Sequence, residues 1–161
     1  MAKEVKTNAM RILDKQKISY ELISYECDEF IDGMHSASIT GAPVERSFKT
    51  LVAQGKSGQY YVLVIPIADE VDLKAAARAV GEKSIEMIHV KDITAVTGSV
   101  RGGCSPIGMK KQYPTFIQEV AKQYDKIYVS GGRIGITLHL DTEALCRVCR
   151  GTYADFVVKQ Q

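Results

Sequence analysis

The sequence predicts a mixed α/β fold of the α+β type, in which a largely antiparallel, barrel-like sheet is surrounded by short helices. The clearest signal is a hairpin, with strands over residues 47–54 and 60–65 joined by a turn at 55–58. Its second strand, YYVLVI, is apolar throughout, which is typical of a central strand. Helical and extended stretches alternate along the chain without regular βαβ spacing, and this irregularity excludes a Rossmann fold.

Composition limits the organisation and the class of partner. The 161 residues, 45% of them hydrophobic, suffice for one buried core, so we expect a single domain over residues 1–161. A formal charge of only +2 argues against a protein that binds DNA. The first residues lack the apolar core of a signal peptide, and no window is long and apolar enough to span a bilayer. These features predict a cytoplasmic protein with reduced cysteines and no membrane partner.

The chain begins with a helix and a strand. A helix is expected over residues 7–17, because Met10 and Leu13 fall on one face after a Thr7 cap. The alternation of polar and apolar residues over 18–25 then predicts a strand.

Later elements are defined by helix caps and by runs of branched and aromatic residues. In chain order they are a helix capped by Asp72 and ended by Gly81, a short helix over 92–96, a strand over 116–117, a helix over 119–124, strands over 126–130 and 134–140, and a last helix from 141 to about 150. The segment 27–43 is compatible with a short helix ending at Gly41 or with a loop over a pocket.

The run Gly102–Gly108 is the most informative stretch of the chain. Two adjacent glycines allow the backbone to approach a ligand closely and to point successive N–H groups at an oxyanion or phosphate, while Pro106 stiffens the loop. A sharp bend between two strands is the alternative interpretation.

Two polar residues, one inside a predicted strand and one at the end of another, are further candidates for binding. Alternation places Lys49 on the face opposite Phe48, where it either discourages edge aggregation or binds anions and carbonyl oxygens. Ser130 ends a strand directly before Gly131, so its hydroxyl either reaches a ligand or caps the turn.

The cysteines and histidines do not form a recognisable catalytic or metal-binding motif. Cys146 and Cys149 have no second pair at zinc-ligand spacing, so they are interpreted as small helix side chains, and no metal or cofactor is expected. A thiol at Cys104 could act as a nucleophile, but no histidine is evidently paired with it, and a small residue fitting a crowded loop is favoured. His139 lies in an alternating strand and is interpreted as structural.

Together these runs resemble the YbaK/EbsC family of aminoacyl-tRNA deacylases, and most of all its members that act on Cys-tRNA(Pro) or Cys-tRNA(Cys). The resemblance extends over nearly the whole chain and rests on the order and spacing of Phe48-Lys49-Thr50-Leu51, Asp72-Leu73-Lys74, Gly102-Gly103-x-Ser105-Pro106-x-Gly108-x-Lys110-Lys111, Pro114-Thr115 and Ile127-Tyr128-Val129-Ser130-Gly131-Gly132-Arg133.

The resemblance implies an enzyme that removes a mischarged amino acid from the tRNA 3′ end in trans editing, with a fold like the editing domain of prolyl-tRNA synthetases. A synthetase pocket built for proline cannot strongly reject cysteine, so a second site must remove the error. The chemistry is expected to be substrate-assisted. The enzyme would be a hydrolase, or a lyase if the cysteine thiol closes a thiolactone.

The resemblance also implies roles for individual residues. Lys49, Gly102 and Ser130 would be catalytic, with the loop N–H groups stabilising negative charge on the carbonyl oxygen. Thr137 stands where some relatives carry an aspartate for the substrate amino group. The residues expected to bind substrate are Tyr25, Gly103, Cys104, Ser105, Pro106, Gly131 and Thr137.

The expected partners follow from this substrate. A single-stranded CCA end can enter a pocket on a small domain, and a charge of +2 predicts weak, salt-sensitive affinity for tRNA. A transient complex with prolyl-tRNA synthetase would deliver the tRNA. The alternative function is a non-catalytic module that binds a nucleotide or anion at the glycine run.

Overall fold

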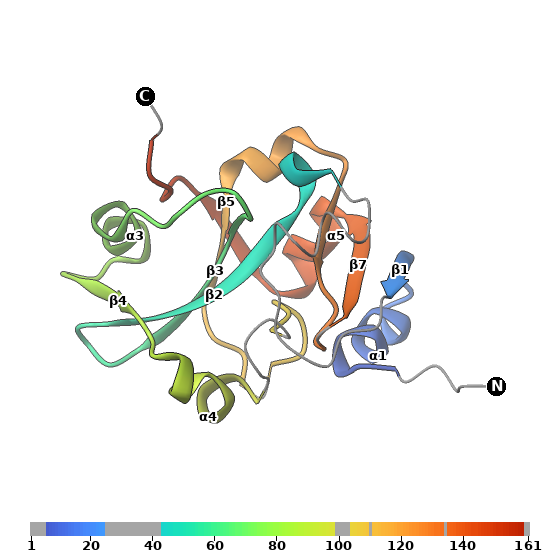
Figure 1. Ribbon diagram of the computed structural model, residues 1–161, viewed down its shortest axis with the longest axis horizontal. Coiled ribbons are helices and arrows are strands. Elements are labelled where there is room, and N and C mark those ends of the chain that lie inside the picture. The colour runs from blue at the N-terminus through green and yellow to red at the C-terminus, as the bar shows by residue number, and fades with distance from the viewer. Residues whose placement is uncertain (1–5, 25–42, 99–103, 110, 134, 160–161) are drawn as a thin grey trace.

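The strands of the protein are arranged in two sheets that meet at one edge (Figure 1). The computed structural model describes residues 6–24, 43–98, 104–109, 111–133 and 135–159. The smaller sheet has the order β1 (Tyr20–Ser24), β7 (Ile136–Asp141), β6 (Lys126–Ser130). The larger has the order β4 (Ile85–Met87), β2 (Phe48–Gly55), β3 (Tyr60–Pro66), β5 (Thr115–Gln118), β8 (Gly151–Ala154).

Strand pairing confirms the predicted mixed, largely antiparallel α/β class. Strands β1, β7 and β6 pair antiparallel, as do β4, β2 and β3, whereas β3, β5 and β8 pair parallel. The predicted hairpin is β2–β3, and β6 has the predicted bounds. The short strands β4 and β8 were not predicted from the sequence.

Short helices cover the sheets. They are α1 (Asn8–Lys15), α3 (Leu73–Val80), α4 (Ile93–Thr97), α5 (Thr142–Val148) and the 3-10 helices η1 (Val44–Arg46), η2 (Val90–Asp92) and η3 (Glu119–Gln123). Helices α1, α3 and α5 start at the caps expected from the sequence, whereas the sequence does not predict η1 and η2. The Asp72 carboxylate accepts hydrogen bonds from the first turn of α3, and Gly81 ends that helix at a φ of 82°. In the described residues, no helix has the length and apolar character needed to cross a membrane.

Two buried clusters lie on opposite faces of β2 and β3. Phe48 and Val52 face the first cluster, which also receives α1, the inner face of the small sheet and Leu145 of α5. Ala53 faces the second, which lies under α3. In Figure 1, α1, β1 and β7 accordingly lie on one side of the β2–β3 hairpin, and α3 and β4 on the other.

The N-terminus of α1 is attached to the turn after β6. The Thr7 hydroxyl accepts a hydrogen bond from the Met10 amide and donates one to the Gly131 carbonyl. Both positions of this turn require glycine. A Cβ atom at Gly131 would lie 2.5 Å from the Ile136 side chain, and Gly132 has a φ of 98°. One threonine therefore caps the helix and fixes the position of the glycine turn.

Replacing Thr7 with valine keeps its shape but removes both bonds. We expect the free energy of unfolding to fall by about 2 kcal/mol, since a helix cap and a buried carbonyl partner are lost together. Urea denaturation measures this. The matched control is Thr94→Val, at an exposed position in the first turn of α4, which should change stability little. Equal losses in both variants would contradict the role assigned to Thr7.

Candidate functional site

A parallel bridge between Ser47 and Tyr128 joins the two sheets and aligns β2 with β6. Both strands run in the same direction from this bridge, so Lys49 and Ser130 each lie two residues beyond it. Paired residues point to the same side of a sheet and side chains alternate along each strand. Lys49 and Ser130 therefore share a face, and that face is turned away from the cluster containing Phe48, as the sequence predicted for Lys49.

The small sheet extends this face by two strands. Ser130 is paired with Thr137 of β7, and Thr137 with Ile23 of β1. We call Lys49, Ser130, Thr137 and Ile23 the Lys49 row; all four are half-buried. It places an ammonium group, two hydroxyl groups and one apolar side chain on a common surface, which suits a small polar ligand with a carbonyl group.

The turn after Ser130 orients its hydroxyl. The Gly132 amide donates a hydrogen bond to Ser130 Oγ at 3.3 Å, and the Gly131 amide donates to the Ile136 carbonyl at 2.8 Å. A hydroxyl can accept two hydrogen bonds and donate one, so Ser130 retains the capacity to donate to a ligand oxygen while it caps the turn. Both sequence interpretations of this serine are thus compatible.

Residues 104–108, the described part of the glycine run, lie beside the same turn. The Asn8 side chain donates a hydrogen bond to the Gly108 carbonyl at 2.9 Å, and residue 7, its neighbour, contacts Gly131. The first residues of α1 therefore hold both glycine runs. A hollow of about 420 Å³ forms where they meet, and it is lined by Asn8, Ala9, Thr97, Gly98, Ser105, Ile107, Gly108, Met109 and Gly132.

The loop side chains that were expected to bind substrate are buried. Cys104 is 8% exposed, Ser105 is 2% exposed, and Pro106 is buried as well. Ser105 Oγ accepts a hydrogen bond from the Ile107 amide. Any ligand contact at these positions would therefore be made mainly by the backbone. Tyr25, Gly102 and Gly103 lie outside the described residues, so their proposed roles stay predictions.

The environment of Cys104 suits a structural side chain better than a nucleophile. Burial raises the pKa of its thiol, an effect that the Thr97 hydroxyl, 3.6 Å from the sulfur, partly offsets. A protonated thiol attacks carbonyl groups poorly. This geometry favours the interpretation of Cys104 as a small residue in a crowded loop.

Cys146 and Cys149 lie at the end of α5, and Cys149 is its C-cap. The Cys146 thiol donates a hydrogen bond to the Gly151 carbonyl at 3.2 Å. Burial raises the pKa of Cys149 to about 12. Within the described ranges no group of three or more histidine, cysteine or acidic side chains is placed to hold a metal ion.

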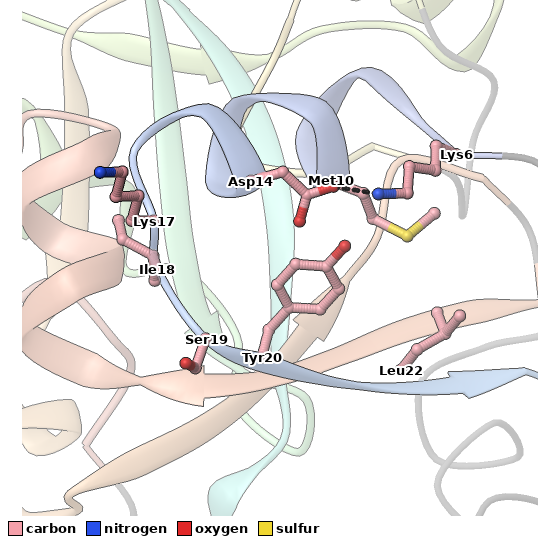
Figure 2. A pocket seen from close by; sticks show the side chains of 8 residues that line it. All are labelled: Lys6, Met10, Asp14, Lys17, Ile18, Ser19, Tyr20 and Leu22. Atoms are coloured by element: carbon pink, nitrogen blue, oxygen red, sulfur yellow. Dashed lines mark hydrogen bonds and ion pairs between the residues drawn. The ribbon is translucent and has the colours of Figure 1, made fainter.

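A further hollow, of about 590 Å³, lies elsewhere, between α1 and β1 (Figure 2). Tyr20 and Leu22 point into it from β1, and an ion pair between Lys6 and Asp14 crosses it. Tyr20 and Leu22 are paired with Leu140 and Leu138, whose side chains face the core. This hollow is thus on the face of the small sheet opposite the Lys49 row.

The sequence does not show that a second row of side chains lies next to the Lys49 row. His139, interpreted as structural, is paired with Tyr128 on the Lys49 face, one alternate position away from Ser130 and Thr137. Alternation along residues 126–130 and 134–140 could have shown that Tyr128 and Ser130 share a face, but not which residues of the two strands are paired.

Comparisons with known proteins agree with this fold. Residues 34–148 match the family model described as the aminoacyl-tRNA editing domain. The chain is 43% identical over 158 residues to EbsC of Enterococcus faecalis (strain ATCC 700802 / V583), named as a candidate Cys-tRNA(Pro)/Cys-tRNA(Cys) deacylase, and the match covers 96% of this chain and 95% of that protein.

Two solved structures are similar in fold. The crystal structure of a hypothetical protein, APE2540, has a TM-score of 0.86 at 17% identity, covering 94% of this chain and 100% of the other. That of a candidate trans-editing enzyme for prolyl-tRNA synthetase has a TM-score of 0.82 at 21% identity, covering 97% of this chain and 100% of the other. At these identities they support the fold alone.

The thiol environments predict an order of alkylation. With iodoacetamide at pH 8, Cys146, which is half-buried, should be labelled at least about tenfold faster than Cys104 or Cys149, because burial keeps those two thiols protonated. Peptide mass mapping over time measures the rates, and labelling in 6 M guanidinium should remove the differences. Fastest native labelling at Cys104 would instead support a reactive nucleophile.

Proposed function

This chain belongs to the aminoacyl-tRNA editing domain family, and from that premise we propose that it edits mischarged tRNA in trans, cleaving the ester that joins cysteine to tRNA(Pro). The observation that carries the proposal is the Ser47–Tyr128 bridge, which sets Lys49, Ser130 and Thr137 on one half-buried face. These residues come from three strands, and their side chains suit the carbonyl and amino groups of an aminoacyl ester.

The site has to orient the substrate and stabilise charge. The cysteine sulfur attacks its own carbonyl carbon, and the C–O bond to the ribose breaks. The thiol proton ends on the ribose oxygen, and a thiolactone is released that water opens to cysteine. The ring contains sulfur, Cβ, Cα and the carbonyl carbon, so it is small and strained. Negative charge on the carbonyl oxygen therefore needs strong stabilisation.

Two groups of the Lys49 row can supply that stabilisation. The Lys49 ammonium provides a full positive charge, and the Ser130 hydroxyl, held by the Gly132 amide, donates a hydrogen bond. We further propose that the Gly102 and Gly103 amides complete the oxyanion site, as the family resemblance implies. No side chain has to act as nucleophile, which is consistent with the raised pKa of Cys104.

The second part of the proposal is how the tRNA reaches this protein. With 21 basic and 19 acidic residues the protein attracts a polyanion weakly, so we propose that prolyl-tRNA synthetase hands over the tRNA in a transient complex. Deacylation should then accelerate when the synthetase is added at physiological salt. Full activity without the synthetase, together with no association in a pull-down, would remove this part.

Replacing Lys49 with alanine tests the charge at the site. We expect kcat/KM for Cys-tRNA(Pro) to fall by at least about 100-fold, the loss typical of removing one group that stabilises an oxyanion. Lys56→Ala is the matched control, because Lys56 is an exposed lysine in the turn directly after β2, and this variant should keep full activity. Retention of most activity by Lys49→Ala would contradict the assignment.

Thr137→Asp tests the recognition of the substrate amino group. A carboxylate placed beside Ser130 should pair with the protonated amine and lower KM for Cys-tRNA(Pro) by about two- to fivefold, the effect of one partly exposed ion pair. Thr152→Asp, an exposed strand position on β8, controls for added charge. If both variants change KM equally, Thr137 does not face the substrate.

A further inference from the structure

A second row of side chains lies beside the Lys49 row on the same face. Ser47 is bridged to Tyr128, Tyr128 is paired with His139, and His139 with Glu21. We call Tyr128, His139 and Glu21 the aromatic row. Alternate residues of a strand are about 7 Å apart, so this is the spacing between the two rows.

The aromatic row has a defined geometry. The rings of Tyr128 and His139 are stacked, with centroids 4.1 Å apart and planes inclined by 7°. On its other side, His139 Nδ1 lies 3.4 Å from a carboxylate oxygen of Glu21. The carboxylate and the tyrosine ring together hold the imidazole in one orientation.

Core packing does not account for these rings. Tyr128 belongs to neither hydrophobic cluster, whereas its chain neighbours Ile127 and Val129 are fully buried in the first. Both Tyr128 and His139 are half-buried on the outer face of the sheet. Two aromatic rings on a sheet face, next to a site for a nucleotide ester, are a typical arrangement for stacking an unpaired base.

We propose that the aromatic row is the binding site, here called the adenine seat, for the terminal adenine of the tRNA. The ribose ester of the same nucleotide lies at the Lys49 row. This inference rests on the proposed function for the choice of nucleotide. In the terminal nucleotide, the ribose separates the ester from the base. The spacing of the two rows matches that separation, so the two rows can bind the ester and the base of one nucleotide. Glu21 acts as a positioning residue, because it holds the His139 ring rather than the base.

A cation borders the aromatic row on the side away from the Lys49 row. Lys126 lies two residues before Tyr128 on β6, so the two share a face, and Lys126 is exposed. Asp141 is paired with Lys126 across the strands, but its carboxylate caps α5 by accepting a bond from the Ala144 amide. The Lys126 ammonium suits the phosphate that precedes the terminal nucleotide.

The test compares two RNA probes and two tyrosine variants. The probes are the single-stranded tetranucleotide ACCA and the trinucleotide ACC, which lacks the terminal adenosine, and binding is measured by calorimetry at low salt. Tyr128→Leu removes the ring, and Tyr128→Phe retains it as the matched control. Thermal melting of each variant verifies that it is folded.

We expect Tyr128→Leu to weaken binding of ACCA by about tenfold, as for loss of one stacked base, and to leave ACC unchanged. Tyr128→Phe should bind ACCA within twofold of the wild type. For Cys-tRNA(Pro), Tyr128→Leu should raise KM by a similar factor with kcat nearly unchanged, since stacking holds substrate and transition state alike. Glu21→Ala should give a smaller rise in KM than Tyr128→Leu.

Equal weakening of ACCA and ACC, or no weakening of either, would overturn the adenine seat even if the wild type deacylates Cys-tRNA(Pro). Loss of ACCA binding in Tyr128→Phe would do the same, because the ring is still present. Conversely, ring-dependent ACCA binding by a wild type that cleaves no ester would refute the proposed function and leave the seat supported. The two hypotheses therefore fail separately.

Discussion

The candidate site depends on the parallel bridge between Ser47 and Tyr128. The two sheets have separate strand orders, and this bridge aligns the start of β2 with β6. Because side-chain direction alternates along each strand, the register of β2 against β6 determines which side chains share the outer face. A shift by one residue would turn Lys49 toward the first cluster and present Phe48 instead. The core patterns of both strands resist such a shift, so the packing of the interior also fixes the site.

A second constraint comes from the start of α1. Thr7 bonds to Gly131 and Asn8 to Gly108, so two neighbouring residues hold two turns that are far apart in the sequence. Met10 and Leu13 anchor the same helix in the first cluster. Burial of this helix thereby positions the glycine turns, which themselves contribute few apolar side chains.

The sequence predicts those features that depend on residues close together along the chain. The β2–β3 hairpin and β6 follow from alternation and turn residues, whereas β4 and β8 have three and four residues and form through pairing with distant strands. Lys49 and Ser130 emerge as candidates from their places in predicted strands, and the resemblance adds their catalytic roles, yet their common face depends on a contact between residues 47 and 128. Alternation along its strand favours a structural His139, and the register that places it beside Tyr128 has no local signature in the sequence.

A crystal structure with a non-hydrolysable substrate analogue would show which face of the small sheet binds the ester. The analogue is cysteine joined by an amide bond to 3′-amino-3′-deoxyadenosine. We expect the carbonyl oxygen to lie within hydrogen-bonding distance of Lys49 Nζ or Ser130 Oγ, on the outer face of the small sheet. Binding in the hollow between α1 and β1, on the opposite face, would contradict this expectation.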